Sequence, residues 1–537
     1  MDVTDWDTLS DLPHHTTGWQ KDLPLALGPV LGHVTTDTIR VWARAREPGA
    51  RLLVRFAPAA PGATFDPETG VFQPLALAGP VRELPLPPGD PHYHTAVVTL
   101  TGLDPDTRYF YEIIDADAPR PEGALLTAAP PSFRTLPARE LTEDQGGLRF
   151  AFLSCNGVQA RPPGKAATAM WRRLCVQALR DERVRFAIMA GDQIYADAIR
   201  EGWLADNSRS YKLDPAATEA LYRRLLPEYG RIYLAWWRRA AIRTLMAHLP
   251  SVMTWDDHEI YDGWGSFGDE HLPAQQAFFR AAAAAFDAHQ LALAPPGHGL
   301  ARGEGHRAFH FCVGRVGFLV LDLRTNRRAR TMATSALLGD AQWAYVQQAL
   351  DTFASDGVHQ LVVVTSVPPV YADRWLLGLP KAILRDSHDD FVDQWASPPN
   401  RSDQLLLLGK LFRFRARTGA NVIVLGGDVH LGCVGRITSE APEFLFRGES
   451  SATLHQAVSS AIAYHPPAGM LGSLVAMHVD GDHPISRTFR GTIDATHLDR
   501  NFAIVSAVAQ KRAFWFDLHV EEQLPPVVYH FEGPPGA

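Results

Sequence analysis

Residues 184–195 have the sequence Val-Arg-Phe-Ala-Ile-Met-Ala-Gly-Asp-Gln-Ile-Tyr, in which a largely apolar run leads to Gly-Asp192 and, three residues later, to Tyr195. Such runs are typical of buried strands in α/β domains. Three more apolar runs end in polar motifs: residues 148–153 precede Ser-Cys155-Asn, residues 251–254 precede Trp-Asp-Asp257-His258-Glu, and residues 421–425 precede Gly-Gly-Asp428-Val-His430. Because ligands collect at the carboxyl ends of strands in such sheets, we expect these side chains to meet at one rim.

The side chains of these motifs are carboxylates, imidazoles, a thiol and a phenol. Placed together in a region of low dielectric constant, they would concentrate negative charge at a high free-energy cost unless cations neutralised it. A single Gly-Asp after a strand is more often a turn with a solvated carboxylate, and a single cysteine is usually a small buried hydrophobic residue. The joint occurrence of the motifs therefore favours a metal site over a purely structural explanation.

In order and composition the motifs resemble those of the PhoD-like (alkaline phosphatase D) branch of the calcineurin-like metallophosphoesterases, whose pattern is Ser-Cys, Gly-Asp-x-x-Tyr, Trp-Asp-Asp-His-Glu and Gly-Asp-x-His. With weaker similarities at residues 321–324, 338–343, 393–395 and 501–502, the resemblance covers approximately residues 25–535. It implies an α/β fold with a metallophosphoesterase-type two-sheet core flanked by helices, preceded by a small all-β fibronectin- or Ig-like sandwich. It also implies hydrolysis of phosphomonoesters or phosphodiesters, in which a dinuclear or larger metal centre activates a nucleophilic oxygen.

The resemblance further implies which residues hold the metals. Asp192 would bridge two cations; the first would also bind Cys155, Tyr195 and His430, and the second Asp257 and Asp428. A thiolate is unsuited to Mg²⁺ and a phenolate favours trivalent iron, whereas oxygen ligands alone suit Ca²⁺, Mn²⁺ or Mg²⁺. We therefore expect Fe³⁺ and Ca²⁺, with Mn²⁺, Mg²⁺ and Zn²⁺ as alternatives.

His258 and Arg324 are the predicted catalytic residues. In the wider superfamily the histidine equivalent to His258 faces the phosphoryl oxygen and the leaving group, so we expect transition-state stabilisation or general-acid catalysis. The alternative is a histidine that orients Asp256 or Glu259. Arg324 follows the apolar run 318–323 and is a candidate phosphate clamp, because a guanidinium can bind two phosphoryl oxygens. The alternative is a structural ion pair with Asp322 or Asp340.

The chain departs from the family pattern in several places. Ala396 follows Trp395 where relatives usually have an aspartate, Asn156 replaces a common glutamine, and the stretch Val-Val-Val-Thr-Ser-Val-Pro-Pro at 362–369 ends its strand without a histidine. These differences leave the substrate preference and any additional ligands of the second metal open.

Hydrophobic patterning divides the chain into four parts. Residues 1–26 are predicted to be an N-terminal extension, residues 137–147 a polar linker, and residues 148–537 the metallophosphatase domain. Residues 27–136 alternate polar and apolar in short bursts between Pro and Gly clusters, which is typical of an antiparallel sandwich. Tyr109 lies in a segment similar to the tyrosine corner of fibronectin-like domains, for which we predict a structural role.

The stretch 197–248 is a large insertion rich in aromatic residues. Their helical spacing favours core packing. The alternative is an aromatic rim that stacks on substrate and covers the metals, which would slightly favour phosphodiesters over phosphomonoesters.

Composition limits the kinds of partner that the protein could bind and the cellular compartments in which it could reside. The chain has 537 residues and a formal net charge of −8, without a basic cluster, which disfavours a nucleic-acid duplex. No apolar run approaches the length of a membrane span, the first residues are acidic rather than typical of a signal peptide, and the scattered cysteines predict free thiols. As written, the sequence predicts a cytoplasmic protein; an exported protein trimmed of its signal is the alternative. The oligomeric state is not predicted.

Two classes of function remain. One is a hydrolase acting on a small phosphoester; the other is a non-catalytic protein whose sandwich recognises a partner and whose metallophosphatase domain is a scaffold. Because all nominated ligand side chains are present, we expect the hydrolase.

Overall fold

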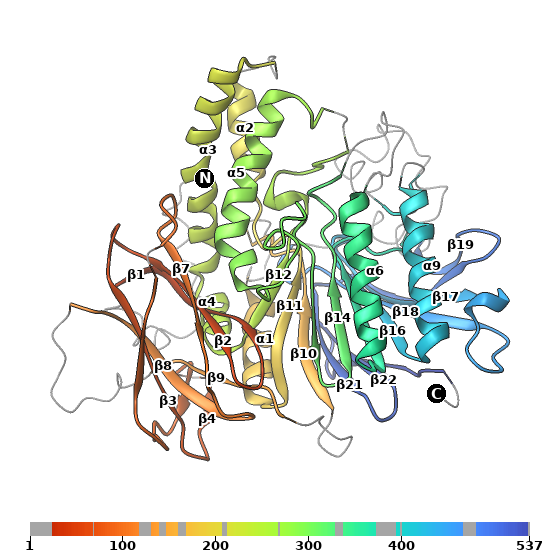
Figure 1. The fold of residues 1–537 in the computed structure, drawn as a ribbon, viewed down its shortest axis with the longest axis horizontal. Helices are drawn as coiled ribbons and strands as arrows, with labels where there is room; N and C mark the ends of the chain where they lie inside the picture. Colours follow the sequence, from red (N-terminus) through yellow and green to blue (C-terminus); the bar gives the residue numbers. More distant parts are fainter. Residues whose placement is uncertain are drawn as a thin grey trace.

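The computed structural model describes residues 24–67, 69–87, 89–117, 130–138, 147–158, 168–206, 212–266, 269–327, 337–371, 394–397, 400–464 and 479–534. An all-β sandwich at the N-terminus lies beside a larger α/β part built on two sheets (Figure 1). The predicted fold class is therefore confirmed.

The N-terminal strands pair in antiparallel sheets with the orders β1-β2-β7 and β6-β3-β8-β9, and β4 pairs with β5. The Tyr109 hydroxyl accepts a hydrogen bond from the Asp104 N–H at 2.8 Å, as a tyrosine corner would. The strands are β1 (Leu25–Val34), β2 (Ile39–Ala45), β3 (Leu52–Pro58), β4 (Thr64–Asp66), β5 (Val71–Gln73), β6 (Arg82–Pro85), β7 (Thr95–Leu100), β8 (Arg108–Asp115) and β9 (Ser132–Arg134). The next strand begins at Leu148, and the division at residues 137–147 stays a prediction.

Two mixed sheets form the α/β part. The six-stranded sheet has the order β12-β11-β10-β21-β22-β23 and the eight-stranded sheet the order β13-β14-β15-β16-β18-β17-β20-β19. Their strands are β10 (Leu148–Leu153), β11 (Val184–Ala190), β12 (Ser251–Thr254), β13 (Phe309–Val313), β14 (Val316–Val320), β15 (Gln360–Thr365), β16 (Asn421–Gly426), β17 (Gly432–Ser439), β18 (Ala452–Ser459), β19 (Gly481–Pro484), β20 (Arg490–His497), β21 (Asn501–Val508), β22 (Ala513–Val520) and β23 (Val527–Phe531). Each sheet contains a block of parallel strands: β10, β11 and the edge strand β12 in one, and β14, β15, β16 and β18 in the other.

The two sheets pack face to face. The Phe318 ring of β14 meets Phe150 of β10 and Phe186 of β11 edge-on, with ring centroids 5.3 and 5.4 Å apart. Side chains of β15 alternate between the two sides, as the pleat requires: Val362 and Val364 join the core between the sheets, whereas Leu361 and Val363 join the core beneath α6 and α9. This packing holds the carboxyl ends of the parallel strands of both sheets at one rim.

Helices flank the two sheets, and some of them stand together beyond the strands (Figure 1). They are α1 (Ala169–Arg180), α2 (Asp197–Asp206), α3 (Pro215–Trp237), α4 (Ala240–His248), α5 (Pro273–His289), α6 (Gly339–Ser355) and α9 (Arg401–Thr418), with short 3₁₀ helices η3 (Asp257–Glu259), η4 (Leu291–Leu293) and η7 (Pro442–Phe444). The aromatic insertion forms α2, α3 and α4. None of the described helices is long and apolar enough to cross a membrane, and the four cysteines have free thiols, as predicted.

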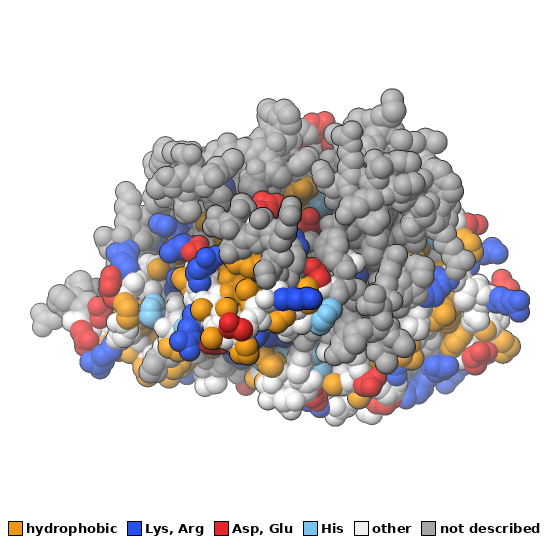
Figure 2. Space-filling model, turned by 90° about the horizontal axis from the view of Figure 1, so that it is seen from above, with side chains coloured by type: hydrophobic (Ala, Val, Ile, Leu, Met, Phe, Trp, Pro, Cys, Tyr) orange, Lys and Arg blue, Asp and Glu red, His pale blue; other side chains and the backbone are white. Residues whose placement is uncertain are grey.

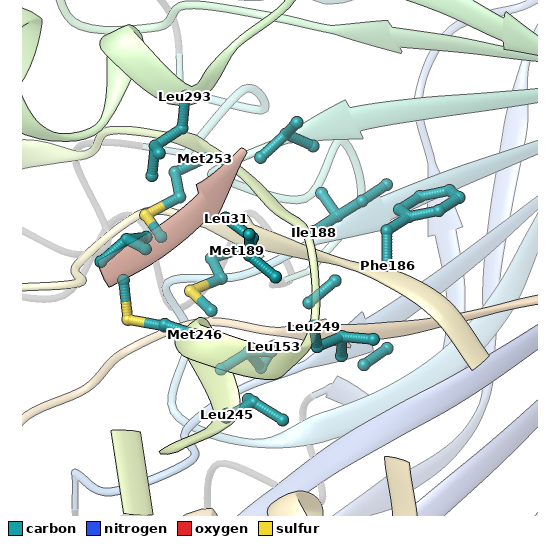
Figure 3. Close-up of a cluster of buried hydrophobic side chains, with 14 of the residues drawn as sticks. Leu31, Leu153, Phe186, Ile188, Met189, Leu245, Met246, Leu249, Met253 and Leu293 are labelled. Carbon is teal, nitrogen blue, oxygen red and sulfur yellow. The ribbon is translucent and has the colours of Figure 1, made fainter. Parts of the chain in front are cut away.

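The sandwich and the α/β part share one hydrophobic core. Figure 3 shows Leu31 of β1 packed among side chains of the α/β part, which come from β10 (Leu153), β11 (Phe186, Ile188, Met189), β12 (Met253), α4 (Leu245, Met246), the turn after α4 (Leu249) and η4 (Leu293). Polar groups cross the same seam: the Trp42 indole donates to the Ala288 carbonyl at 2.8 Å, and the Tyr111 hydroxyl donates to the Ala247 carbonyl at 2.8 Å. The sandwich is thus fastened to the helices that support β12.

Candidate metal centre

The predicted ligand side chains converge at the ends of β10, β11, β12 and β16. One ligand atom from each of Cys155, Asp192 and His430 lies within 4.8 Å of the others. The same holds for Asp192, Asp257 and His258, and for Asp192, Asp256, Asp257 and Asp428. Asp192 belongs to all three groups, as a bridging ligand would. Asp256 was not predicted as a ligand.

The backbone at four of these residues is left-handed. Cys155, Asp192, Asp428 and His430 have φ angles of 56°, 55°, 64° and 54°. Non-glycine residues in this region carry about 1–2 kcal/mol of strain each, and such strain gathers where a site requires it. Gly191 precedes Asp192 because a Cβ there would lie 2.7 Å from the Asp256 Cβ. The backbone of the strand-end motifs therefore directs the ligand side chains toward one another, and this conformation lowers the stability of the fold.

The acidic side chains of the site are buried, and their ionised forms would be stabilised by positive charge nearby. Burial raises the pKa values of Cys155, Asp192 and Tyr195 well above their usual ranges, and neighbouring acidic groups raise them further. Asp192 Oδ1 and the Tyr195 hydroxyl are buried without a hydrogen-bond partner among the described residues. Buried polar atoms of this kind normally have a partner, and cations would neutralise the acids and satisfy both atoms. The residues present fit a metal centre.

Tyr195 lies in a continuous stack of rings. Its ring centroid is 4.1 Å from that of His258 and 5.3 Å from that of Tyr464, and the Tyr464 ring lies 4.2 Å from that of His430. Gly157 leaves room for Tyr464, since a Cβ there would lie 2.2 Å from its Cδ2 atom. Tyr464 lies outside every motif, so the sequence offered no signal for it.

His258 is paired with Asp197, a residue that the motif analysis missed. Its Nδ1 lies 2.9 Å from Asp197 Oδ1, which also accepts the Asp262 N–H at 2.7 Å. Burial alone would lower the pKa of His258, but Asp197, Asp192 and Asp257 raise that pKa well above its usual value in the site without cations. The predicted alternative partners are engaged elsewhere: Asp256 with Arg324, and Glu259 with backbone N–H groups. The position of Asp197, two residues after Tyr195, is the sequence signal that could have identified it as a partner of His258.

Arg324 lies beneath the site rather than facing an opening. Its side chain is fully buried, forms an ion pair with Asp256 and lies 3.3 Å from Asp257 Oδ1. It also donates to the Trp264 carbonyl at 3.1 Å. The predicted alternative partner Asp322 instead accepts the Arg324 backbone N–H and the Trp255 indole N–H. These contacts favour a residue that positions Asp256 and Asp257, and the phosphate clamp stays a prediction.

The aromatic insertion packs behind the site. Tyr229, Tyr233, Trp236 and Trp237 are buried, whereas Tyr211 lies outside the described residues. The Trp236 indole donates to the Asn156 carbonyl at 2.8 Å, and the Tyr229 hydroxyl donates to the Ile260 carbonyl at 2.6 Å. The buried rings support the loops that carry Cys155 and Asp257, which favours core packing for them. Tyr222 is half-buried, and the preference for diesters stays a prediction.

Two of the weaker similarities are structural. Asp322 and Trp395 are fully buried, and the Trp395 indole donates to the Val367 carbonyl at 2.9 Å; Asp393 lies outside the described residues. On the face shown in Figure 2, described basic side chains are scattered among acidic and hydrophobic ones. The exclusion of a nucleic-acid duplex stays a prediction.

Two facing sheets with acidic, thiol and imidazole side chains gathered at their strand ends form a metallophosphoesterase-type core. The profile of the PhoD-like phosphatase family matches residues 150–472, and the chain belongs to this family. Alkaline phosphatase D of Bacillus subtilis is 22% identical over 355 residues, which are 63% of this chain and 53% of that protein. An uncharacterized protein of Saccharomyces cerevisiae is 23% identical over 320 residues, 47% of this chain and 45% of its own length. The chain thus spans about half the length of these relatives.

Solved structures agree on the fold. The structure of PhoD superposes with a TM-score of 0.59 at 18% identity, covering 95% of this chain and 89% of that one. A purple acid phosphatase from yellow lupin seeds superposes with a TM-score of 0.53 at 13% identity, covering 94% of this chain and 74% of that one.

Proposed function

We propose that the chain is a metal-dependent hydrolase of small phosphoesters with at least two cations at the strand ends. The observation that carries the proposal is the position of Asp192, which is buried and shared by all three groups of ligand atoms. Such a shared carboxylate suits a pair of metals spaced for in-line displacement at phosphorus.

The donor sets suggest different metals. The thiolate site, formed by Cys155, Asp192, Tyr195 and His430, combines a thiolate and a phenolate with an imidazole, which favours Fe³⁺. The carboxylate site, formed by Asp192, Asp257 and Asp428, has oxygen donors only and favours Ca²⁺, with Mn²⁺, Mg²⁺ and Zn²⁺ as alternatives.

The chain's own residues would donate a proton to the leaving group. Bound cations would supply positive charge to the phosphoryl oxygens and activate an attacking water. Asp197 fixes the ring of His258 through Nδ1, so a protonated His258 would present Nε2–H to the leaving-group oxygen. Arg324 would hold Asp256 and Asp257 in place rather than touch substrate. Phosphomonoesters and phosphodiesters both remain candidate substrates.

Hydrolysis of nitrophenyl phosphate and bis(nitrophenyl) phosphate tests the proposal. Protein supplied with iron and calcium should hydrolyse at least one of them and lose this activity on chelation. Asp192→Asn should be inactive, whereas Asp351→Asn, on the exposed surface of α6, should match the wild type. A metal-loaded wild type that hydrolyses neither ester would contradict the proposal and favour the partner-binding alternative.

A further inference from the structure

Two buried side chains outside the predicted ligand set, Glu259 and Ser460, each join two loops that carry ligands. Resting on the dinuclear centre proposed above, we infer that Glu259 is the positioning residue of the carboxylate site and Ser460 that of the thiolate site. Each metal would then depend on its own hydrogen-bonding support.

Glu259 joins the loop after β11 to the loop after β12. Its Oε2 accepts the N–H groups of Asp192 at 3.0 Å and Asp256 at 2.8 Å. Its Oε1 accepts the Gln193 N–H at 2.7 Å and the Gln290 side-chain N–H at 2.9 Å. With both oxygens engaged and only 1% of the residue exposed, Glu259 fixes the separation of these loops.

Ser460 joins the loop after β10 to the loop after β16. Its hydroxyl donates to Cys155 Sγ at 3.0 Å and accepts the His430 N–H at 3.1 Å. The Ser460 carbonyl in turn accepts the Asn501 side-chain N–H at 2.6 Å, and the residue is fully buried. One hydroxyl therefore orients two ligands of the thiolate site.

The two supports divide the centre unequally. Asp192 and Asp257, two of the three carboxylate-site ligands, lie on the loops that Glu259 joins. Of the four thiolate-site ligands, Asp192 and Tyr195 follow β11 on a loop that Glu259 joins, whereas Cys155 and His430 lie on the two loops that Ser460 joins. Loss of Glu259 should thus weaken the carboxylate site more, and loss of Ser460 the thiolate site more.

Metal retention tests this division. Glu259→Gln preserves shape but turns one acceptor oxygen into a donor that faces backbone N–H groups, and we expect the carboxylate-site metal to bind about tenfold to one-hundredfold more weakly, as is typical when an outer support is lost. Ser460→Ala should weaken the thiolate-site metal to a similar extent. Holo-proteins dialysed against graded chelator would be compared by elemental analysis, and anomalous diffraction from their crystals would give the occupancy of each position.

Matched controls isolate the effect. Ser439→Ala removes a buried hydroxyl that accepts the Ala441 N–H, and Glu449→Gln alters a carboxylate paired with Arg415. Both should retain both metals. If Glu259→Gln does not fold, Gln290→Met removes one of the four hydrogen bonds and should selectively weaken the carboxylate site.

Variants that lose both metals equally, or lose neither, would overturn the division. A wild type that holds no metal would refute the dinuclear centre itself, and with it this inference. Two metals in the wild type with unaltered retention in both variants would refute the inference alone.

Discussion

Acidification should loosen the seam between the sandwich and the α/β part through His248. Burial and, after it, Arg108 lower the pKa of His248 to about 3, against smaller raising effects of hydrogen bonds to the backbone of Ser132 and Gly70. Arg134, Arg185 and Glu182 are the other charged groups that line the same small cavity. His248 Nδ1 accepts the Ser132 N–H at 3.0 Å and lies 3.3 Å from the Ser132 carbonyl. A proton on Nδ1 would exchange the first bond for the longer one and place a charge beside Arg108.

The size and sign of the effect follow from linkage. The folded-state pKa lies below the unfolded value of 6.5, so the unfolded chain binds the proton first and the contribution of His248 to stability is complete only above pH 6.5. Below that value the free energy of unfolding falls by about 1.4 kcal/mol per pH unit, which amounts to about 2 kcal/mol at about pH 5.

His248→Asn isolates this contribution, since an Asn oxygen can accept the Ser132 N–H but cannot be charged. Urea unfolding of metal-free protein would be followed at about pH 7.5 and about pH 5, with exposed His92→Asn as the control. At the higher pH the His248→Asn variant should have a smaller free energy of unfolding than the wild type, because packing is lost. At the lower pH this difference between variant and wild type should shrink by about 2 kcal/mol. A deficit that is the same at both pH values would refute the reasoning.

Three predictions concern the metal centre. Asp192→Asn should abolish turnover and reduce metal content while the melting curve stays cooperative, because Asn tolerates the left-handed backbone; full activity at normal metal occupancy would contradict a dinuclear centre. Tyr195→Phe should remove or shift a visible charge-transfer band of the iron-loaded protein, and a colourless, fully active protein with zinc or manganese alone would exclude the iron assignment. His258→Ala should slow the chemical step by about two to four orders of magnitude with metal content unchanged. The rate of this variant should fall less with a nitrophenolate leaving group than with an alkyl alcohol, and equal decreases in rate would speak against general-acid catalysis.

The strands that carry the ligands were predictable because short stretches of sequence mark where each strand begins and ends. The runs predicted at residues 148–153, 184–190 and 251–254 coincide with β10, β11 and β12, and the run at 421–425 differs from β16 by one residue. Apolar composition marks a buried strand, and Gly-Asp or Asp-Asp-His marks where it stops. Local signals were therefore enough to assemble the predicted ligand set.

The supporting residues could not be predicted in this way, because their roles depend on contacts between distant segments. Arg324 and Asp256 are 68 residues apart, and Ser460 and Cys155 are 305 residues apart. Nothing in the residues around Tyr464 indicates that its ring will stack between Tyr195 and His430. The chemistry of an arginine suggested a phosphate clamp, whereas its position at the base of the site depends on the packing of the two sheets.

The core shared across the seam bears on how such chains can be recombined. A recognition module joined to an enzyme usually meets it through a small, rather polar interface, and could be exchanged between relatives at the linker. Here a crossover at residues 137–147 would separate Leu31 from Met253 and Leu245, and Trp42 from the Ala288 carbonyl. Chimeras should fold only when the sandwich and the helices beneath it come from the same parent. The sandwich is thus inherited with the scaffold, and its sequence should change in step with α4 and α5.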